Sequence, residues 1–166
     1  MKPLKNLRST CLLNSFFADS SNPKRQFWVP NLSLFLPDGI GETNQLGIDY
    51  YNKLINELIA NDITPAVTLY HWDLPQTLQD LGGWLNPDVS NWFENYASVV
   101  FKEFGDRVKI WITINEPWVI STLLNLSPGM TGPGILEYRV AHNLIRSHAK
   151  AYRLYKKDFF ESQGGM

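Results

Sequence analysis

Two short polar segments, each directly after an apolar run, hold the side chains that could do chemistry. His71-Trp72-Asp73 follows the apolar residues up to Tyr70, and Asn115-Glu116-Pro117 follows the apolar residues up to Ile114. A carboxyl group can transfer a proton, an amide or an imidazole can bind a hydroxyl, and an indole ring can stack on a flat apolar face. These residue types suit acid–base chemistry on a ligand that carries hydroxyl groups, such as a sugar.

Glu116 is the strongest candidate for a catalytic residue. It closes an apolar segment that begins at Val108, so we expect its carboxyl group to be partly desolvated, which raises its pKa and favours the protonated form. A general acid needs a proton that it still holds near neutral pH. The alternative is that Glu116 only caps the turn at Pro117.

The neighbouring residues also allow two interpretations each. His71 either donates to a hydroxyl or is a core histidine bonded to backbone. Trp72 either stacks on a sugar ring or packs at the open end of a barrel. Asn115 can bind a hydroxyl without adding charge. Asp73 is expected to cap the turn that follows it. No histidine and carboxylate have the spacing of metal ligands, so the sequence predicts no metal and no cofactor.

An alternating order of strands and helices would position these side chains. Helical spacing of apolar residues predicts helices after a cap at Asp49, after Asn86-Pro87, and over residues 137–159, and apolar runs predict strands over 63–70 and 108–114. For the last helix we expect an inward face made of Ala141, Leu144, Ile145, His148 and Tyr152.

Continuous apolar strands between such helices are typical of an α/β fold with a parallel sheet buried on both faces. The carboxyl ends of parallel strands meet at one rim, where the two polar segments should therefore meet. A doubly wound sheet and a closed (β/α)8 barrel both fit this order. No glycine-rich phosphate loop follows a strand, which weakens the nucleotide-binding version of the first.

The composition excludes several classes of protein. The chain has 166 residues, 44% apolar and 13% aromatic, with 15 basic and 16 acidic side chains and a net charge of −1. This charge gives no long-range attraction to nucleic acid, no apolar run is long enough for a membrane span, and one cysteine cannot form an internal disulfide. Residues 1–30 show no periodicity and are expected to be loop or disordered. They contain no convincing signal peptide.

Six strings occur along the chain in a fixed order and spacing. They are GIDYYN (47–52), TPAVTLYHWDLPQ (64–76), GGWL (82–85), FGDRVK (104–109), WITINEPW (111–118) and AHNLIRSHAKA (141–151). Together they resemble glycoside hydrolase family 1, which comprises β-glucosidases, myrosinases and lactase-like enzymes. The resemblance covers residues 37 to 165.

The resemblance implies a partial (β/α)8 TIM barrel, about βα units 2–4 of the parent fold, within a domain over residues 31–166. It implies a retaining β-glycosidase that hydrolyses O-glycosyl or S-glycosyl bonds of a small-molecule glycoside. Glu116 would be the acid/base residue, Asn115 would contact the sugar 2-hydroxyl, and His71 would hold the 3-hydroxyl with Trp72 close by. In animals the family is extracellular or lumenal, but the sequence leaves the compartment of this chain open.

The chain also departs from the family pattern. The family's second strand reads like Ser-Trp-Ser-Arg-Ile-Leu-Pro, whereas residues 31–37 place Leu34 where the arginine is expected. The string around the family's nucleophile, Thr/Ser-Glu-Asn-Gly, is absent, and a whole barrel needs about 250 residues. We therefore expect a fragment that is inactive by itself and that self-associates through open sheet edges. The rival hypotheses are a non-catalytic carbohydrate-binding or receptor-like module and an inactive splice or gene-model product.

Overall fold

The computed structural model describes residues 17–18, 22, 24–30, 32–36, 38–124 and 134–165. Its strands are β1 (Phe17–Ala18), β2 (Arg25–Trp28), β3 (Thr64–Tyr70) and β4 (Ile110–Ile114). Its helical elements are α1 (Leu32–Phe35), α2 (Gln45–Ala60), α3 (Gln76–Asp80), the 3-10 turn η1 (Gly83–Leu85), α4 (Val89–Phe104), α5 (Pro117–Val119), the π-helical turn η2 (Ile120–Leu124), α6 (Leu136–Leu154), the π-helical turn η3 (Tyr155–Phe159) and α7 (Phe160–Gln163).

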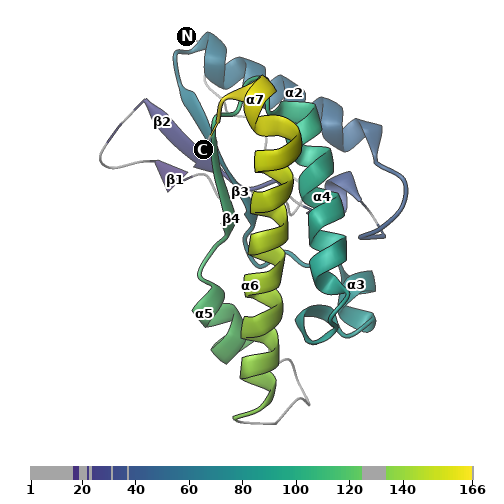
Figure 1. Cartoon of the computed structure of the whole chain (residues 1–166). Coiled ribbons are helices and arrows are strands. Elements are labelled where there is room, and N and C mark those ends of the chain that lie inside the picture. Colours follow the sequence, from purple (N-terminus) through teal and green to yellow (C-terminus); the bar gives the residue numbers. More distant parts are fainter. Residues whose placement is uncertain are drawn as a thin grey trace.

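The strands form one sheet in the order β1-β2-β3-β4. β2, β3 and β4 run parallel, with Phe27 opposite Ala66 and Thr68 opposite Ile112, and β1 pairs antiparallel with β2. The predicted parallel sheet is therefore confirmed, and α4 and α6 lie side by side along it (Figure 1). β3 is buried from Pro65 to Tyr70 because it has a strand on each side.

The prediction of burial on both faces is wrong for β4. Only Ile114 of this strand is fully buried, and Ile112 is 38% exposed. The reason is the place of β4 at the end of the strand order, since among the described residues no strand pairs with its outer edge. An apolar strand sequence therefore does not guarantee burial in this chain.

The structure corrects the sequence analysis near the N-terminus. Arg25–Trp28 forms strand β2, within the segment expected to be loop, and most of that segment lies outside the described residues. The residues aligned with the family's second strand do not form a strand, since Leu32–Phe35 is the short helix α1. β2 escaped prediction because it is only four residues long and depends on its pairing with β3.

The first two long helices agree with the apolar periodicity, but α2 begins earlier than expected. The helix starts at Gln45, and its N-cap is Asn44, whose side chain accepts a hydrogen bond from the Leu46 amide at 3.2 Å. Asp49 lies inside the helix and is exposed. An asparagine at this place satisfies a free amide of the first turn, which explains why the helix starts there.

The predicted inward face of α6 is mostly wrong. Ile145 and Tyr152 are 67% and 54% exposed, and His148 is exposed as well. The buried residues of this helix are Val140, Asn143, Leu144, Ser147 and Ala151. The buried residues recur at helical spacing and include the small or polar Asn143, Ser147 and Ala151 beside Val140 and Leu144, whereas Ile145 and Tyr152 lie on the more exposed side of the helix.

Aromatic residues build the core between the sheet and the helices. The rings of Trp28 and Tyr51 stack at 4.6 Å, those of Phe35 and Tyr51 at 4.8 Å, and Phe104 lies edge-on to Phe35 at 5.6 Å. These residues come from β2, α1, α2 and α4 and are all buried. Most of the aromatic content therefore serves packing. Within the described part of the chain, no helix is both long and apolar enough to cross a membrane.

Candidate active site

The two polar segments meet at the carboxyl ends of β3 and β4, as the sequence predicts. The Asn115 amide donates to the Tyr70 carbonyl at 2.9 Å, which continues the strand pairing one residue past the end of β4. The side chains of Asn115 and His71 are in direct contact, with 3.1 Å between Nδ2 and Nε2. The Trp72 Nε1 group donates to the Asn115 carbonyl at 3.3 Å. The structure thus brings together His71, Trp72 and Asn115.

Asn115 and His71 form a polar pair at this rim. The Asn115 NH2 group can only donate, so it bonds His71 in the tautomer whose Nε2 is free to accept. His71 is partly exposed, and the indole of Trp72 lies edge-on to its ring at 5.3 Å with 42% of Trp72 exposed. A polar pair beside an exposed indole face suits a ligand with both hydroxyl groups and flat apolar faces.

Glu116 follows this pair directly and occupies the N-cap position of α5. Its side chain makes no capping hydrogen bond, so the alternative that Glu116 merely caps the turn is not supported. The expectation that its carboxyl group is partly desolvated is wrong, because Glu116 is exposed. The cause is again the open outer edge of β4, which leaves the strand end without a covering neighbour among the described residues.

Backbone strain is concentrated at this rim. Among the described residues, three non-glycine residues have positive φ, namely Asp62, Trp72 and Glu116, and the last two belong to the site with φ 69° and 45°. A side chain in this conformation costs about 1–2 kcal/mol. Such strain persists where the surrounding structure enforces it, and it is common at functional sites.

Asp73 does not cap the following helix, which corrects the sequence analysis. α3 has Pro75 at its N-cap, with no side-chain cap. The Asp73 carboxylate instead accepts hydrogen bonds from the Leu32 amide at 3.0 Å and from the His71 amide at 3.3 Å. Burial raises the pKa of Asp73 above its ordinary value of 3.8, and these backbone donors oppose that rise.

A buried aromatic pair, Tyr70 and Trp84, packs behind the end of β3 and was not predicted from the sequence. The Trp84 Nε1 group donates to the Tyr70 hydroxyl at 3.1 Å, and their rings meet edge to face at 5.0 Å. Burial raises the pKa of Tyr70, so its hydroxyl stays neutral. The Asn143 side chain of α6 donates to the Trp84 carbonyl at 2.8 Å and to the Asn86 carbonyl at 3.3 Å. The tryptophan of the GGWL string at 82–85, between α3 and α4, is the signal that could have found this support.

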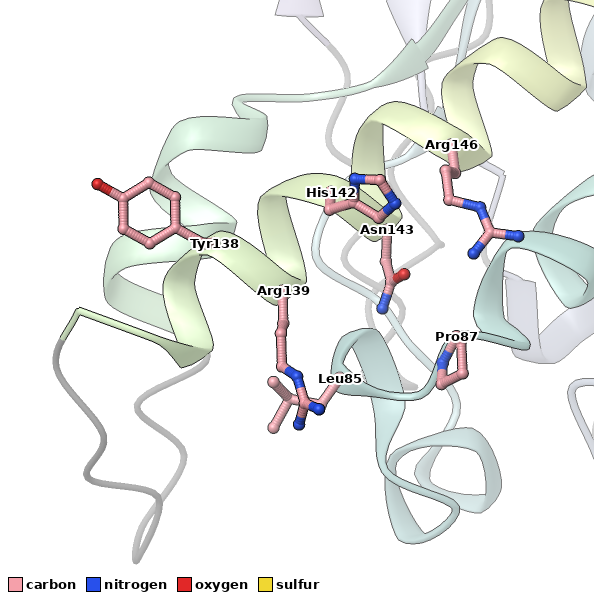
Figure 2. A pocket seen from close by; sticks show the side chains of 7 residues that line it. All are labelled: Leu85, Pro87, Tyr138, Arg139, His142, Asn143 and Arg146. Atoms are coloured by element: carbon pink, nitrogen blue, oxygen red, sulfur yellow. The ribbon is translucent and has the colours of Figure 1, made fainter.

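Two hollows lie away from the rim, and neither is lined by His71, Trp72, Asn115 or Glu116. The hollow in Figure 2 has a volume of about 410 Å³ and lies between α6 and the segment around Pro87, with Asn143, Arg139 and Arg146 directed toward it. A second hollow, of about 540 Å³, lies between β4 and α6. Within the described residues, no three His, Cys, Asp or Glu side chains gather where they could hold a metal ion.

Comparisons with known proteins agree with the resemblance found in the sequence. The family model for glycosyl hydrolase family 1 matches residues 31–166. The cytosolic β-glucosidase of Homo sapiens is 51% identical over 140 residues, which are 81% of this chain and 30% of that protein. The 1,4-β-D-glucan glucohydrolase of Thermotoga neapolitana is 46% identical over 135 residues, which are 79% of this chain and 32% of that protein.

Solved structures of similar proteins match the described fold. Aphid myrosinase has a TM-score of 0.79 and 46% identity, covering 84% of this chain and 31% of that one. A β-glucosidase from Thermotoga maritima in complex with glucoimidazole has a TM-score of 0.75 and 44% identity, covering 79% and 30%. The expected fold class is confirmed as part of a (β/α)8 barrel. The chain spans about a third of the length of the relatives that it matches.

Proposed function

Because the chain belongs to glycosyl hydrolase family 1, we propose that it supplies the acid/base side of a retaining β-glycosidase site. In this proposal Glu116 protonates the leaving oxygen and then takes a proton from water. The observation that carries the proposal is the contact of His71 with Asn115 at 3.1 Å, directly beside a strained and exposed Glu116. The hydrolase names of the relatives do not favour a non-catalytic binding module.

The proposed substrate is a small β-glycoside with glucose as its sugar. Relatives are named as glucosidases, and the Thermotoga maritima enzyme is solved with glucoimidazole and with deoxynojirimycin. Asn115 would contact the sugar 2-hydroxyl and His71 the 3-hydroxyl, while Trp72 would stack near the ring. The likeness to aphid myrosinase keeps S-glycosides within the proposal beside O-glycosides.

A retaining mechanism needs a second carboxylate about 5 to 5.5 Å from the first. A rice relative solved in a covalent complex with Glc supports the retaining route for this family. In this chain Asp73 shares the rim with Glu116, but both of its oxygens accept backbone hydrogen bonds from Leu32 and His71. We therefore do not assign Asp73 the role of nucleophile, and we propose that residues 1–166 alone do not hydrolyse glycosides.

A hybrid enzyme tests the catalytic proposal. Residues 31–166 would replace the matching segment of Thermotoga maritima β-glucosidase A, which is 45% identical over 135 residues. Turnover of an aryl β-glucoside is expected in the hybrid, whereas Glu116→Ala should remove it and the 166-residue chain should show none. A hybrid that folds and binds deoxynojirimycin but loses nothing on Glu116→Ala would refute the role of Glu116.

We also propose that the chain self-associates through β4. The outer edge of this strand has no partner among the described residues, and the apolar hollow of about 540 Å³ beside it is bordered by Ile112 and Tyr152, which are 38% and 54% exposed. Free backbone groups on an edge strand can pair with the same edge of a second copy.

Sedimentation velocity tests the self-association. Ile112→Lys should shift the chain toward monomer, because a charge on an edge strand opposes pairing. Ile40→Lys is the matched control, since Ile40 is exposed to a similar degree, 42%, outside the sheet. Equal association of both variants and the unchanged chain would refute pairing through β4.

A further inference from the structure

Asp73 is a half-buried carboxylate that the proposed mechanism does not use. It lies two residues after His71 and next to Trp72, the residue with φ 69°. Its two oxygens accept from different parts of the chain: Oδ1 from the His71 amide at 3.3 Å, and Oδ2 from the Leu32 amide at 3.0 Å. One side chain therefore joins the rim turn to the start of α1, 41 residues earlier.

The chemistry of this position requires two acceptors. A carboxylate presents two oxygens and no donor, so it satisfies both amides at once. An asparagine would present one oxygen, and its NH2 group would face the second amide, donor against donor. The first amide groups of a helix have no acceptor within the helix itself. In α1, Asp73 supplies the acceptor for the first of them, the Leu32 amide.

The bond to His71 acts on the geometry of the site. It closes a turn in which Trp72 is held in a left-handed conformation, and the turn directs the His71 ring to Asn115 and the Trp72 indole to the Asn115 carbonyl. Without an anchor the left-handed residue has a lower-energy alternative, since L-residues disfavour this conformation by about 1–2 kcal/mol. Release of the turn would move both rings away from Asn115.

We infer that Asp73 is a positioning residue, whose carboxylate holds the His71–Trp72 turn against the start of α1 and thereby keeps the His71 ring on Asn115. This inference rests on the proposed function, in which His71 and Asn115 contact the sugar. Asp73 itself touches no substrate. Its function is to transmit the position of α1 to the sugar-binding pair.

Nuclear magnetic resonance on the 166-residue chain tests this inference. In Asp73→Asn, the contact between the His71 ring and the Asn115 side chain should be lost, and the amide of Leu32 or His71 should exchange with solvent at least about tenfold faster. Asp80→Asn is the matched control, because Asp80 is exposed and, among the described residues, its side chain bonds only Gln76 of its own helix, at 2.7 Å. The control should leave the His71 ring signals unchanged.

The contact between the His71 ring and the Asn115 side chain is the decisive readout, because general destabilisation would not remove this contact from the molecules that remain folded. An unchanged His71–Asn115 contact in Asp73→Asn would overturn the inference. If Asp73→Asn does not fold, amide hydrogen exchange in the unchanged chain tests the inference instead. The Leu32 and His71 amides should then exchange at least about tenfold slower than in an unfolded chain, and unprotected amides would overturn it. Neither readout uses a sugar, so failure to bind glycosides would refute the proposed function alone.

Discussion

The strained backbone of Glu116 leads to a stability prediction that needs no substrate. The residue has φ 45° and ψ 61°, and its exposed carboxyl group has no hydrogen bond or ion pair with any residue that the structure describes. A Cβ atom in this conformation costs about 1–2 kcal/mol. Glycine removes that cost, but its greater conformational entropy in the unfolded chain lowers the free energy of unfolding by about 0.4–1 kcal/mol. Glu116→Gly should therefore be about 0.5–1 kcal/mol more stable than Glu116→Ala.

Urea unfolding of the two variants measures this difference. With a slope of about 2 kcal/mol per molar, the midpoint of Glu116→Gly should lie about 0.3–0.5 M above that of Glu116→Ala. Glu42 is the matched control, because it is an exposed glutamate in a loop and is not among the residues with positive φ. There the order should invert, with glycine less stable than alanine.

The two pairs of variants together isolate the backbone from the side chain. A Glu116→Gly variant that is less stable than Glu116→Ala, as at Glu42, would refute the reasoning that strain is stored at Glu116. If glycine is more stable than alanine at position 116 but less stable at position 42, the chain keeps a glutamate where the backbone conformation favours glycine. That is the pattern of a residue retained for chemistry rather than for folding.

In the hybrid enzyme, Glu116→Gln should lower kcat/KM by about 10²–10⁴ for glycosides with poor leaving groups and much less for activated aryl glycosides, since protonation matters most for a strongly basic oxygen; equal losses would remove the acid role. Burial raises the pKa of Asp73 above 3.8, so the folded chain holds this proton more tightly than the unfolded chain. The free energy of unfolding should then fall as the pH rises from 3.8 through the raised pKa. Urea unfolding at a series of pH values measures this fall, which should be absent in Asp73→Asn. Asn143→Ala leaves the buried Trp84 carbonyl without its Asn143 donor, whereas the Asn86 carbonyl keeps its bond from the Val89 amide; the change should cost about 1–3 kcal/mol in thermal unfolding, against less than about 0.5 kcal/mol for the exposed Asn95→Ala.

Local patterns in the sequence determined much of the fold and most of the candidate site. Helical periodicity was sufficient for α2 and α4, and a run of apolar residues was sufficient for β3, because each signal lies within the element itself. The meeting of His71 with Asn115 could also be predicted. Two parallel strands end at the same rim, so residues that follow the strands become neighbours whatever the details of packing.

Only the tertiary structure decided the features that depend on residues distant in the sequence, namely strand β2, the buried face of α6 and the partners of Asp73. β2 forms because Arg25 pairs with Thr64, and four residues carry no periodicity of their own. α6 has apolar residues on two sides, and only its packing in the fold buries Leu144 and leaves Ile145 67% exposed. Asp73 resembles a local cap in the sequence, yet its partner Leu32 lies 41 residues away. Burial and long-range hydrogen bonds are properties of neighbours in space, and for these residues the neighbours come from elsewhere in the chain.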